Sequence, residues 1–322
     1  MKNVSIVRMV VLAMLAVLLA ACNRQPKPPL VFGADVWPGY ESIYLARSQG
    51  YLPKQGVHLA EYASASEVIQ AFRNHTIQAA GLTMDEALLL RRDIPDLKIV
   101  LLFDASNGAD AILAQPGIAS LAQLQGKRVG VENTALGAYF LSLAMQSAGL
   151  NSQQLDIVPL PVNEQEAAFR THKVDAVVTF EPVRSRLLKA GAVQLFDSSQ
   201  VPGKILDVLV TRDEYIGDYH KELGQLLQGW HRALDYMHSH PDQAAQVMAK
   251  REQVDPAQFR QALQGIRLLD LKRNGEMIMG DPPAAAASLD AAQRFMLNNG
   301  LLQVGVDAAS LLDPTLLAEI QR

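Results

Sequence analysis

Residues 30–62, LVFGADVWPGYESIYLARSQGYLPKQGVHLAEY, contain a strand, a helix and a second strand. Residues 30–34 and 57–62 are short, mainly apolar runs with the length of β-strands. Between them, residues 41–49 carry apolar side chains at helical spacing, and Gly50 follows as a helix terminator. This order predicts two parallel strands joined by a crossover helix.

Two capping boxes mark helix starts in the next segment. The Ser64 hydroxyl is expected to accept from the amide of Glu67, and Thr83 with Glu86 repeats this device. Strands are predicted over residues 77–82 and 97–103, the latter nearly all apolar, as in strands covered on both faces. Regular alternation of strands and helices predicts a parallel, doubly wound α/β sheet.

A second set of alternating elements follows. Strands are predicted over residues 127–131, 155–160, 174–180 and 193–196, and helices over residues 137–148 and 183–189. Asn163 is expected to cap a further helix in this set. One more apolar run, over residues 205–210, then leads into a tail of mostly helices, including a long amphipathic helix over residues 219–238.

This order predicts a second lobe inserted into the first. Lobe 1 would comprise residues 30–106 and 207–322, including the helical tail, and lobe 2 would comprise residues 107–206. The predicted crossovers cover residues 105–113 and 203–210. Two connections between lobes form a hinge.

The first 21 residues have the pattern of a secretory signal peptide. Lys2 and Arg8 precede an apolar run, residues 9–21, that is too short to span a bilayer. Cys22 follows small residues, so we expect its thiol to be lipidated and residues 22–29 to form a lipid-anchored tether. Cys22 is the only cysteine, so no disulfide can form within the chain.

Composition narrows the class of protein. The 322 residues are 49% hydrophobic with a net charge of -4, values typical of a globular protein. A slightly acidic chain without basic runs argues against nucleic acid as a partner. No second apolar stretch has transmembrane length.

Candidate binding residues follow the predicted strands. Ligands of doubly wound sheets bind beyond the carboxyl ends of the strands, where loops and helix N-termini gather. In lobe 1 these loops cover residues 35–40, 83–85 and 104–107, and in lobe 2 they cover residues 132–137, 161–163 and 180–184. Simpler roles remain open: Thr83 and Asn163 are adequate N-caps, residues 104–108 suit a turn, and Thr134 can cap its own helix.

Catalytic motifs are absent from the sequence. It contains no G-x-S-x-G, Walker, G-x-G-x-x-G or H-E-x-x-H pattern. His231, His238 and His240 lie near the end of the long helix, where histidines on a solvated face favour the helix dipole. We therefore expect a binding protein without catalytic residues, metal site or cofactor.

Five stretches carry a resemblance when taken in order: VWPGYESIYLARSQGYLPKQGV (36–57), GLTMDEALLL (81–90), DASNGADAILA (104–114), LQGKRVGVENTALGAYFL (124–141) and KVDAVVTFEPVRSRL (173–187). They are similar to periplasmic substrate-binding proteins of the nitrate, taurine, aliphatic-sulfonate and thiamine-pyrimidine class. The resemblance implies a Venus-flytrap (type 2 periplasmic-binding-protein) fold, two lobes joined by two crossover strands. It also implies delivery of a small molecule to an ABC permease and its ATPase.

The same resemblance implies ligand-binding positions in both lobes. They are Trp37, Gly39, Tyr40, Thr83, Asp85, Ser106 and Asn107 in and near lobe 1, and Thr134, Gly137 and Glu181 in lobe 2. Such proteins act on chemically different ligands, so the ligand is argued from charge. Acids outnumber bases near the predicted cleft: Asp85, Asp104, Asp110, Glu132, Glu181 and Asp207 face only Arg184 and Lys204.

A carboxylate facing an anion is unfavourable, so an amine or aminopyrimidine stacked on Trp37 or Tyr40 suits this balance better than a sulfonate. A sulfonate remains the alternative, because the helix N-terminus near Thr134 and Gly137 could hold an anion.

Asn23, directly after Cys22, predicts sorting to the outer membrane in a Gram-negative cell. A carrier held there could hardly visit an inner-membrane permease. The alternative function is therefore a tethered, monomeric ligand sensor or scavenger that contacts a membrane signalling protein. An enzyme is less favoured: a fungal pyrimidine synthase of the family carries a cysteine-rich iron motif, and Cys22 is the only cysteine of this chain.

Overall fold

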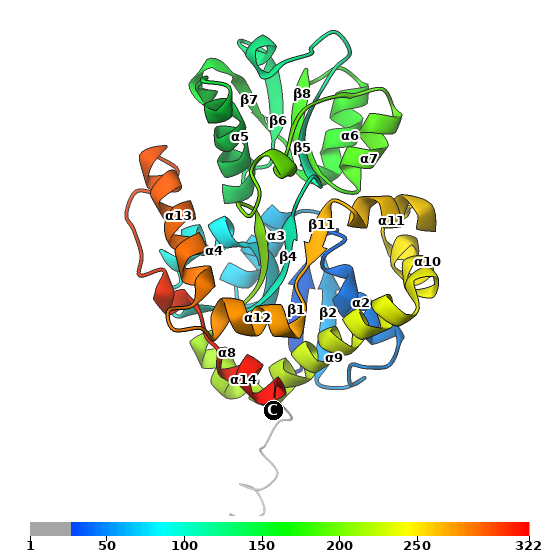
Figure 1. Ribbon diagram of the computed structural model, residues 1–322, viewed down its shortest axis with the longest axis vertical. Coiled ribbons are helices and arrows are strands. Elements are labelled where there is room, and N and C mark those ends of the chain that lie inside the picture. The colour runs from blue at the N-terminus through cyan, green and yellow to red at the C-terminus, as the bar shows by residue number, and fades with distance from the viewer. Residues whose placement is uncertain (1–26, 322) are drawn as a thin grey trace, which may run out of the picture.

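The computed structural model describes residues 27–321, and within them the chain forms two α/β lobes stacked end to end (Figure 1). The predicted signal peptide, Cys22 and the first part of the tether lie outside the described residues. In residues 27–321 no helix combines the length and apolar character needed to cross a bilayer.

Lobe 1 is built on a six-stranded sheet with the strand order β11-β4-β10-β3-β1-β2. The strands are β1 (Leu30–Ala34), β2 (Val57–Glu61), β3 (Ala79–Thr83), β4 (Leu97–Ser106), β10 (Leu206–Arg212) and β11 (Ile266–Leu268). The first helices of this lobe are α2 (Glu41–Ser48), α3 (Ala65–Arg73) and α4 (Met84–Arg91). The tail adds α8 (Asp213–Asp218), α9 (His220–Ser239), α10 (Pro241–Arg251), α11 (Pro256–Leu263), α12 (Leu271–Ile278), α13 (Ala284–Asn298) and α14 (Thr315–Ile320).

Lobe 2 has a five-stranded sheet with the order β7-β6-β8-β5-β9. Its strands are β5 (Asp110–Ala114), β6 (Arg128–Val131), β7 (Asp156–Pro159), β8 (Ala176–Phe180) and β9 (Val193–Asp197). The helices α5 (Ala135–Ser147), α6 (Val162–Arg170) and α7 (Val183–Lys189) pack around this sheet (Figure 1). The predicted fold class, two doubly wound lobes, is confirmed.

Neither sheet is wholly parallel, which corrects the prediction. In lobe 1, β1 pairs in parallel with β2 and β3, but β10 runs antiparallel to β3 and β4. In lobe 2, β5 runs antiparallel to β8 and β9. The reason is the crossover: β4 leaves lobe 1 at its carboxyl end, so β10 re-enters at that same edge and must run the opposite way.

Two short connections join the lobes. The chain leaves lobe 1 through residues 107–109 and returns through residues 198–205. The connections touch, because the Ser106 and Ser198 hydroxyls share a hydrogen bond of 2.7 Å. The Asn107 amide also donates to the Gly265 carbonyl at 2.8 Å, so the turn before β11 supports the hinge. The predicted lobe boundaries at residues 106/107 and 206/207 stay a prediction, since independent movement of the lobes is a dynamic property.

The local capping predictions had two outcomes. Ser64 caps α3 and its hydroxyl accepts from the Glu67 amide at 3.4 Å, as predicted. The prediction for Asn163 was wrong: α6 begins at Val162 with Pro161 as its N-cap, so Asn163 lies in the first turn. The extended backbone that precedes a helix is supplied here by Pro161, with a φ of -58° and a ψ of 147°.

Candidate functional site

A cavity with about 340 Å³ of atom-free space, part of it open to solvent, lies where the lobes meet. Lobe 1 and its return strand line it with Asp35, Trp37, Tyr40, Thr83, Glu86 and Asp207, and lobe 2 lines it with Asp110, Leu136 and Phe180. Most of these residues follow the carboxyl end of a strand or lie at the start of a helix. The cavity therefore lies where doubly wound folds bind their ligands.

The loop between β1 and α2 brings Trp37 to the cavity. Its ring is 4% exposed, and Nε1 donates to the Asp104 carboxylate at 3.2 Å. The ring also meets Phe180 of lobe 2 edge to face, with centroids 5.8 Å apart. Gly39 permits this arrangement, because a β-carbon there would overlap the Asp104 carboxylate and press on the Trp37 nitrogen. Trp37 thus contacts both the hinge strand and the opposite lobe.

Tyr40 occupies the other end of this loop. Its hydroxyl donates to the Asp207 carboxylate on β10 at 2.6 Å, and its ring packs edge-on against Phe103. Gly81 on β3 leaves room for the ring, since a β-carbon there would lie 3.0 Å from it. Tyr40 is therefore positioned by packing as well as by its hydrogen bond.

Buried carboxyl groups dominate the electrostatics of the cavity. Burial raises the pKa values of Glu86, Asp104 and Asp110 to about 7. Burial raises the pKa of Asp35 and of Asp207 well above the usual range, with nearby acids as the next cause. Asp104 and Asp207 are register partners on the neighbouring strands β4 and β10, and the charge of Asp104 adds to the rise in the pKa of Asp207.

Helix α4 carries two of the acids at or beside the cavity, Asp85 and Glu86. The Thr83 amide donates to Glu86 Oε2 at 3.0 Å, which leaves Glu86 Oε1 without a hydrogen-bond partner among residues 27–321. Asp85 is 1% exposed but lies beside the cavity rather than on its lining, and burial raises its pKa well above the usual range. Asp110 Oδ2 likewise lacks a hydrogen-bond partner in the described part of the chain. The cavity therefore offers hydrogen-bond acceptors that the described protein groups leave unused.

The N-terminus of α5 is already capped. The Thr134 hydroxyl accepts from the Gly137 amide at 3.4 Å, and Gly137 is crowded, since a β-carbon there would lie 2.5 Å from the Glu132 carbonyl oxygen. Leu136, rather than Thr134 or Gly137, lines the cavity. The capped end gives little support for an anion at this position.

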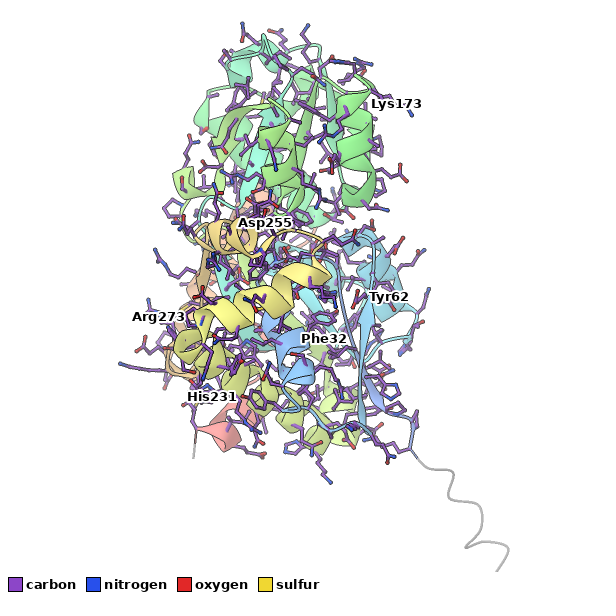
Figure 2. The ribbon with its side chains drawn as sticks, turned by 90° about the vertical axis from the view of Figure 1, so that its right-hand side faces the viewer. Phe32, Tyr62, Lys173, His231, Asp255 and Arg273 are labelled. Carbon is purple, nitrogen blue, oxygen red and sulfur yellow. The ribbon has the colours of Figure 1, made fainter. Side chains whose placement is uncertain are left out.

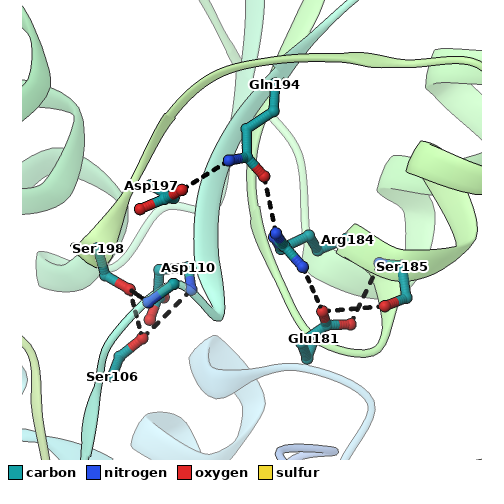
Figure 3. A network of polar contacts seen from close by, with 9 residues as sticks. Ser106, Asp110, Glu181, Arg184, Ser185, Gln194, Asp197 and Ser198 are labelled. Atoms are coloured by element: carbon teal, nitrogen blue, oxygen red, sulfur yellow. Dashed lines mark hydrogen bonds and ion pairs between the residues drawn. The ribbon is translucent and has the colours of Figure 1, made fainter. Parts of the chain in front are cut away.

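Glu181 is held by its own lobe. Its carboxylate accepts from Arg184 Nη1 at 2.8 Å, from the Ser185 amide at 3.1 Å and from the Ser185 hydroxyl at 3.0 Å (Figure 3). The Ser106 hydroxyl also has hydrogen-bond partners within the protein: it shares a hydrogen bond with Ser198 and accepts from the Asp110 amide at 3.2 Å. In this arrangement Glu181, Ser106 and the exposed Asn107 do not line the cavity.

A direct hydrogen-bond latch joins the lobes at the edge of the cleft. Glu132 Oε1 of lobe 2 accepts from the amide and the hydroxyl of Ser66 in the first turn of α3, at 2.9 and 2.6 Å. A carboxylate at a helix N-terminus is favoured by the free amides and by the helix dipole. These two hydrogen bonds connect α3 of lobe 1 directly to lobe 2.

Sequence patterns found only part of the cavity lining. Trp37, Tyr40 and Thr83 line it, whereas Gly39 and Asp85 stand behind it. Phe180 and Glu86 were not among the candidates, although Phe180 ends a predicted strand and Glu86 lies four residues after the end of another. The ligand-binding roles of all ten candidates stay predictions. No group of three or more His, Cys, Asp or Glu side chains within residues 27–321 is arranged to hold a metal ion.

Two lobes, two connecting segments and a cavity between them define the periplasmic-binding-protein fold class. Within that class, the chain belongs to the NMT1/THI5-like family, which it matches over residues 37–244, more than half of its length. A Brucella abortus protein named only as a binding protein is 25% identical over 179 residues, 52% of this chain and 56% of that protein. The chain thus spans about half the length of the curated relatives it matches.

Solved structures with the same fold have varied functions. The alkanesulfonate-binding protein SsuA of Xanthomonas axonopodis pv. citri, bound to MOPS, has a TM-score of 0.75 and 16% identity, over 90% of this chain and 99% of that one. A ligand-binding component of an ABC-type import system from Staphylococcus aureus, with zinc bound, has a TM-score of 0.76 and 15% identity, over 91% and 99%. The desulfurization enzyme DszB has a TM-score of 0.67 and 17% identity, over 91% and 99%. At these identities the likeness establishes the fold, and the ligand must be argued from the cavity.

Proposed function

We propose that this protein is the solute-binding component of an ABC importer in the cell envelope. In this role it closes around a small molecule rich in N–H donors, of the amine or aminopyrimidine type. The observation that carries the proposal is the ring of buried carboxyl groups around the inter-lobe cavity, formed by Asp35, Glu86, Asp110 and Asp207. The importer role is supported by the family match and by the fold shared with a component of an ABC-type import system.

The cavity chemistry favours a donor over an anion. Glu86 Oε1 and Asp110 Oδ2 have no hydrogen-bond partner in the range 27–321, and they are placed to accept from a ligand. Trp37 and Phe180 supply aromatic surface for a flat or cationic group. A sulfonate would instead face several carboxyl groups, and the cavity lining in the described chain includes no Arg or Lys. Desolvating an anion there is costly.

Binding without chemical turnover is part of the proposal. In the described chain, the residues that line the cavity include no Cys, His, Ser or Lys to serve as nucleophile or base. The carboxyl groups are near one another and deeply buried, an arrangement that also suits recognition of a cation. DszB has the same fold, so this point rests on the cavity residues rather than on the fold.

A lipid at Cys22 would hold the monomeric protein at the membrane. This part of the proposal rests on the sequence pattern before Cys22. Asn23 favours an outer-membrane anchor in a Gram-negative cell, and that location supports the second candidate function, a ligand sensor or scavenger that contacts a signalling protein. Lipid labelling and fractionation of cells expressing wild type and Cys22→Ser test the anchor: label and membrane association should both disappear in the variant.

A thermal-shift screen tests the ligand class. The panel contains 4-aminopyrimidine, primary alkylamines, taurine and alkylsulfonates. A ligand at a hundred times its dissociation constant should add about 2.7 kcal/mol to the free energy of unfolding. We expect an amine or aminopyrimidine to stabilise the wild type.

Two variants sharpen the screen. Asp110→Asn should weaken the stabilising amine, whereas Glu164→Gln, at an exposed position of α6, should leave it unchanged. Stabilisation by an alkylsulfonate that Asp110→Asn strengthens would overturn the amine assignment. Failure of every compound to bind would overturn the proposed ligand class altogether.

A further inference from the structure

A second hollow adjoins the cavity on the far side of Phe180. We call it the outer groove; it is lined by Val36, Phe180, Pro182, Arg186, Glu252 and Gln253 among others, and has about 860 Å³ of atom-free space that includes open solvent. It lies between the turn that joins α10 to α11 in lobe 1 and the helices α6 and α7 of lobe 2. Figure 2 shows Asp255, the N-cap of α11, at the level where the lobes meet. Phe180 lines both hollows, so its side chain forms a wall that they share.

Glu252 is the unusual group in the outer groove. Its side chain belongs to a residue that is only 3% exposed, and neither carboxyl oxygen has a hydrogen-bond partner within residues 27–321. A buried carboxyl group without a partner destabilises a fold, so its presence needs a compensating role. Glu252 lines the outer groove with both acceptor oxygens buried, so a donor that binds there must displace the atoms that cover them.

The cations near Glu252 are engaged elsewhere. Arg251 Nε donates to Glu41 Oε1 at 2.7 Å, and Arg251 Nη1 lies 3.1 Å from Glu61 Oε2. Arg186 Nε of lobe 2 donates to Glu166 Oε2 at 2.7 Å. Glu252 consequently lies close to both lobes without joining either ion-pair set.

Burial and neighbouring charges determine the pKa of Glu252. Burial and the charge of Glu41 raise the pKa of Glu252 well above the usual range, Glu181 adds to the rise, and Arg251 and Arg186 oppose it. An ammonium group beside Glu252 would favour the ionised carboxylate and displace its proton. A second amino group on a ligand is thus the chemistry that this position suits.

We propose that the outer groove is a second ligand subsite, in which Glu252 accepts from an amino or ammonium group attached by a short chain to the group in the inner cavity. The Trp37 and Phe180 rings, whose centroids lie 5.8 Å apart in edge-to-face contact, separate the two hollows, so they must move apart when the connecting chain binds. The inference rests on the proposed function, because the first amino group occupies the inner cavity. It extends that function by naming the ligand class: a small heterocyclic or aliphatic diamine.

Calorimetry with two matched probes tests the subsite. The short probe is 4-aminopyrimidine, and the long probe is the same ring carrying a 2-aminoethyl group at carbon 5. We expect the long probe to bind the wild-type protein at least tenfold more tightly than the short one. Glu252→Gln should abolish most of this gain and leave the short probe within twofold, while the exposed Glu164→Gln control behaves as wild type.

A second variant protects the test against misfolding of Glu252→Gln. Asn163 is exposed and lines the outer groove, so Asn163→Trp should obstruct the groove from the surface and reduce the gain of the long probe. Thermal unfolding of each variant checks its fold.

The outcomes separate the two proposals. If the short probe binds and the long probe gains nothing, the subsite is overturned while the proposed function stands. Equal weakening of both probes by Glu252→Gln would also overturn the subsite, since it would indicate a contact that closes the lobes. If neither probe binds the wild type, the amine ligand class fails and the subsite fails with it.

Discussion

The Tyr40 hydroxyl donates to the Asp207 carboxylate at 2.6 Å, and this bond ties the first ligand-side loop to the strand that returns from lobe 2. Asp207 is paired in register with Asp104, which accepts from Trp37. Trp37 and Tyr40 are therefore hydrogen-bonded to the two crossover strands, Trp37 to β4 and Tyr40 to β10. Movement at the hinge and the shape of the cavity are linked through these side chains.

Removing the Tyr40 hydroxyl tests that link. Tyr40→Phe keeps the ring against Phe103 but leaves Asp207 without its donor, so we expect the free energy of unfolding to fall by about 1–3 kcal/mol. Urea unfolding measures the change. Tyr62→Phe, at a half-buried position off the cavity lining, is the matched control and should change stability by less than about 0.5 kcal/mol. Equal effects of the two substitutions would show that the bond contributes no special stability.

Stability should decrease as the pH rises toward and through neutrality. Glu86, Asp104 and Asp110 have folded-state pKa values of about 7, against about 4 in an unfolded chain. Between these values the folded protein binds more protons than the unfolded chain, so the free energy of unfolding falls as pH rises, by up to about 1.4 kcal/mol per pH unit for each group. Opening of the lobes exposes these acids to water, which makes the dependence of the free energy of unfolding on pH less steep.

Urea unfolding of the ligand-free protein at pH 5, 6, 7 and 8 measures this dependence. The double variant Asp104→Asn with Asp110→Asn should flatten the curve, because it removes two of the titrating groups. A rise in stability from pH 5 to pH 8 would contradict the burial of these acids in solution.

The latch between Glu132 and Ser66 should favour the closed protein. Glu132→Ala removes the acceptor of both Ser66 bonds, so we expect a larger radius of gyration in small-angle X-ray scattering and about tenfold weaker ligand binding. Glu164→Ala, an exposed substitution in the same lobe, controls for loss of charge. Unchanged scattering and affinity would mean that other contacts hold the lobes together.

Trp37 should contribute directly to ligand affinity. Trp37→Ala is expected to weaken binding by on the order of 1 kcal/mol or more, because it removes aromatic surface from the cavity. Isothermal titration calorimetry of the wild type and of Trp37→Ala measures the change in affinity. If Trp37→Ala lowers the free energy of unfolding and spares affinity, the ring is structural.

Much of the fold could be predicted from local sequence signals. The unit at residues 30–62 forms a strand, a helix and a strand as expected, and the Ser64 cap depends only on neighbours within one helical turn. Strand β11 was missed, because three residues carry too little periodicity to identify a strand. Asn163 was misassigned because Pro161 supplies the same helix-start geometry two residues earlier.

The candidate site, like the fold, was only partly predictable from local sequence signals. Local sequence signals were enough to predict which loops follow the strands, and they placed Trp37, Tyr40 and Thr83 at the correct edge of the sheet. The folded structure shows that Glu181 is held by Arg184 and Ser185, whereas Glu86, which accepts from the Thr83 amide through Oε2, lines the cavity. Both outcomes depend on side-chain geometry that residue type does not specify.

Long-range pairing was likewise decided only in three dimensions. Asp104 and Asp207 are far apart in the sequence, yet the crossover places them side by side because β10 must enter the sheet from the edge that β4 left. Local capping and periodicity act over a few residues, so the sequence alone fixed the elements and their order. The direction of the crossover strands and the charge of the cavity arise from contacts between distant segments, so only the packed lobes could fix them.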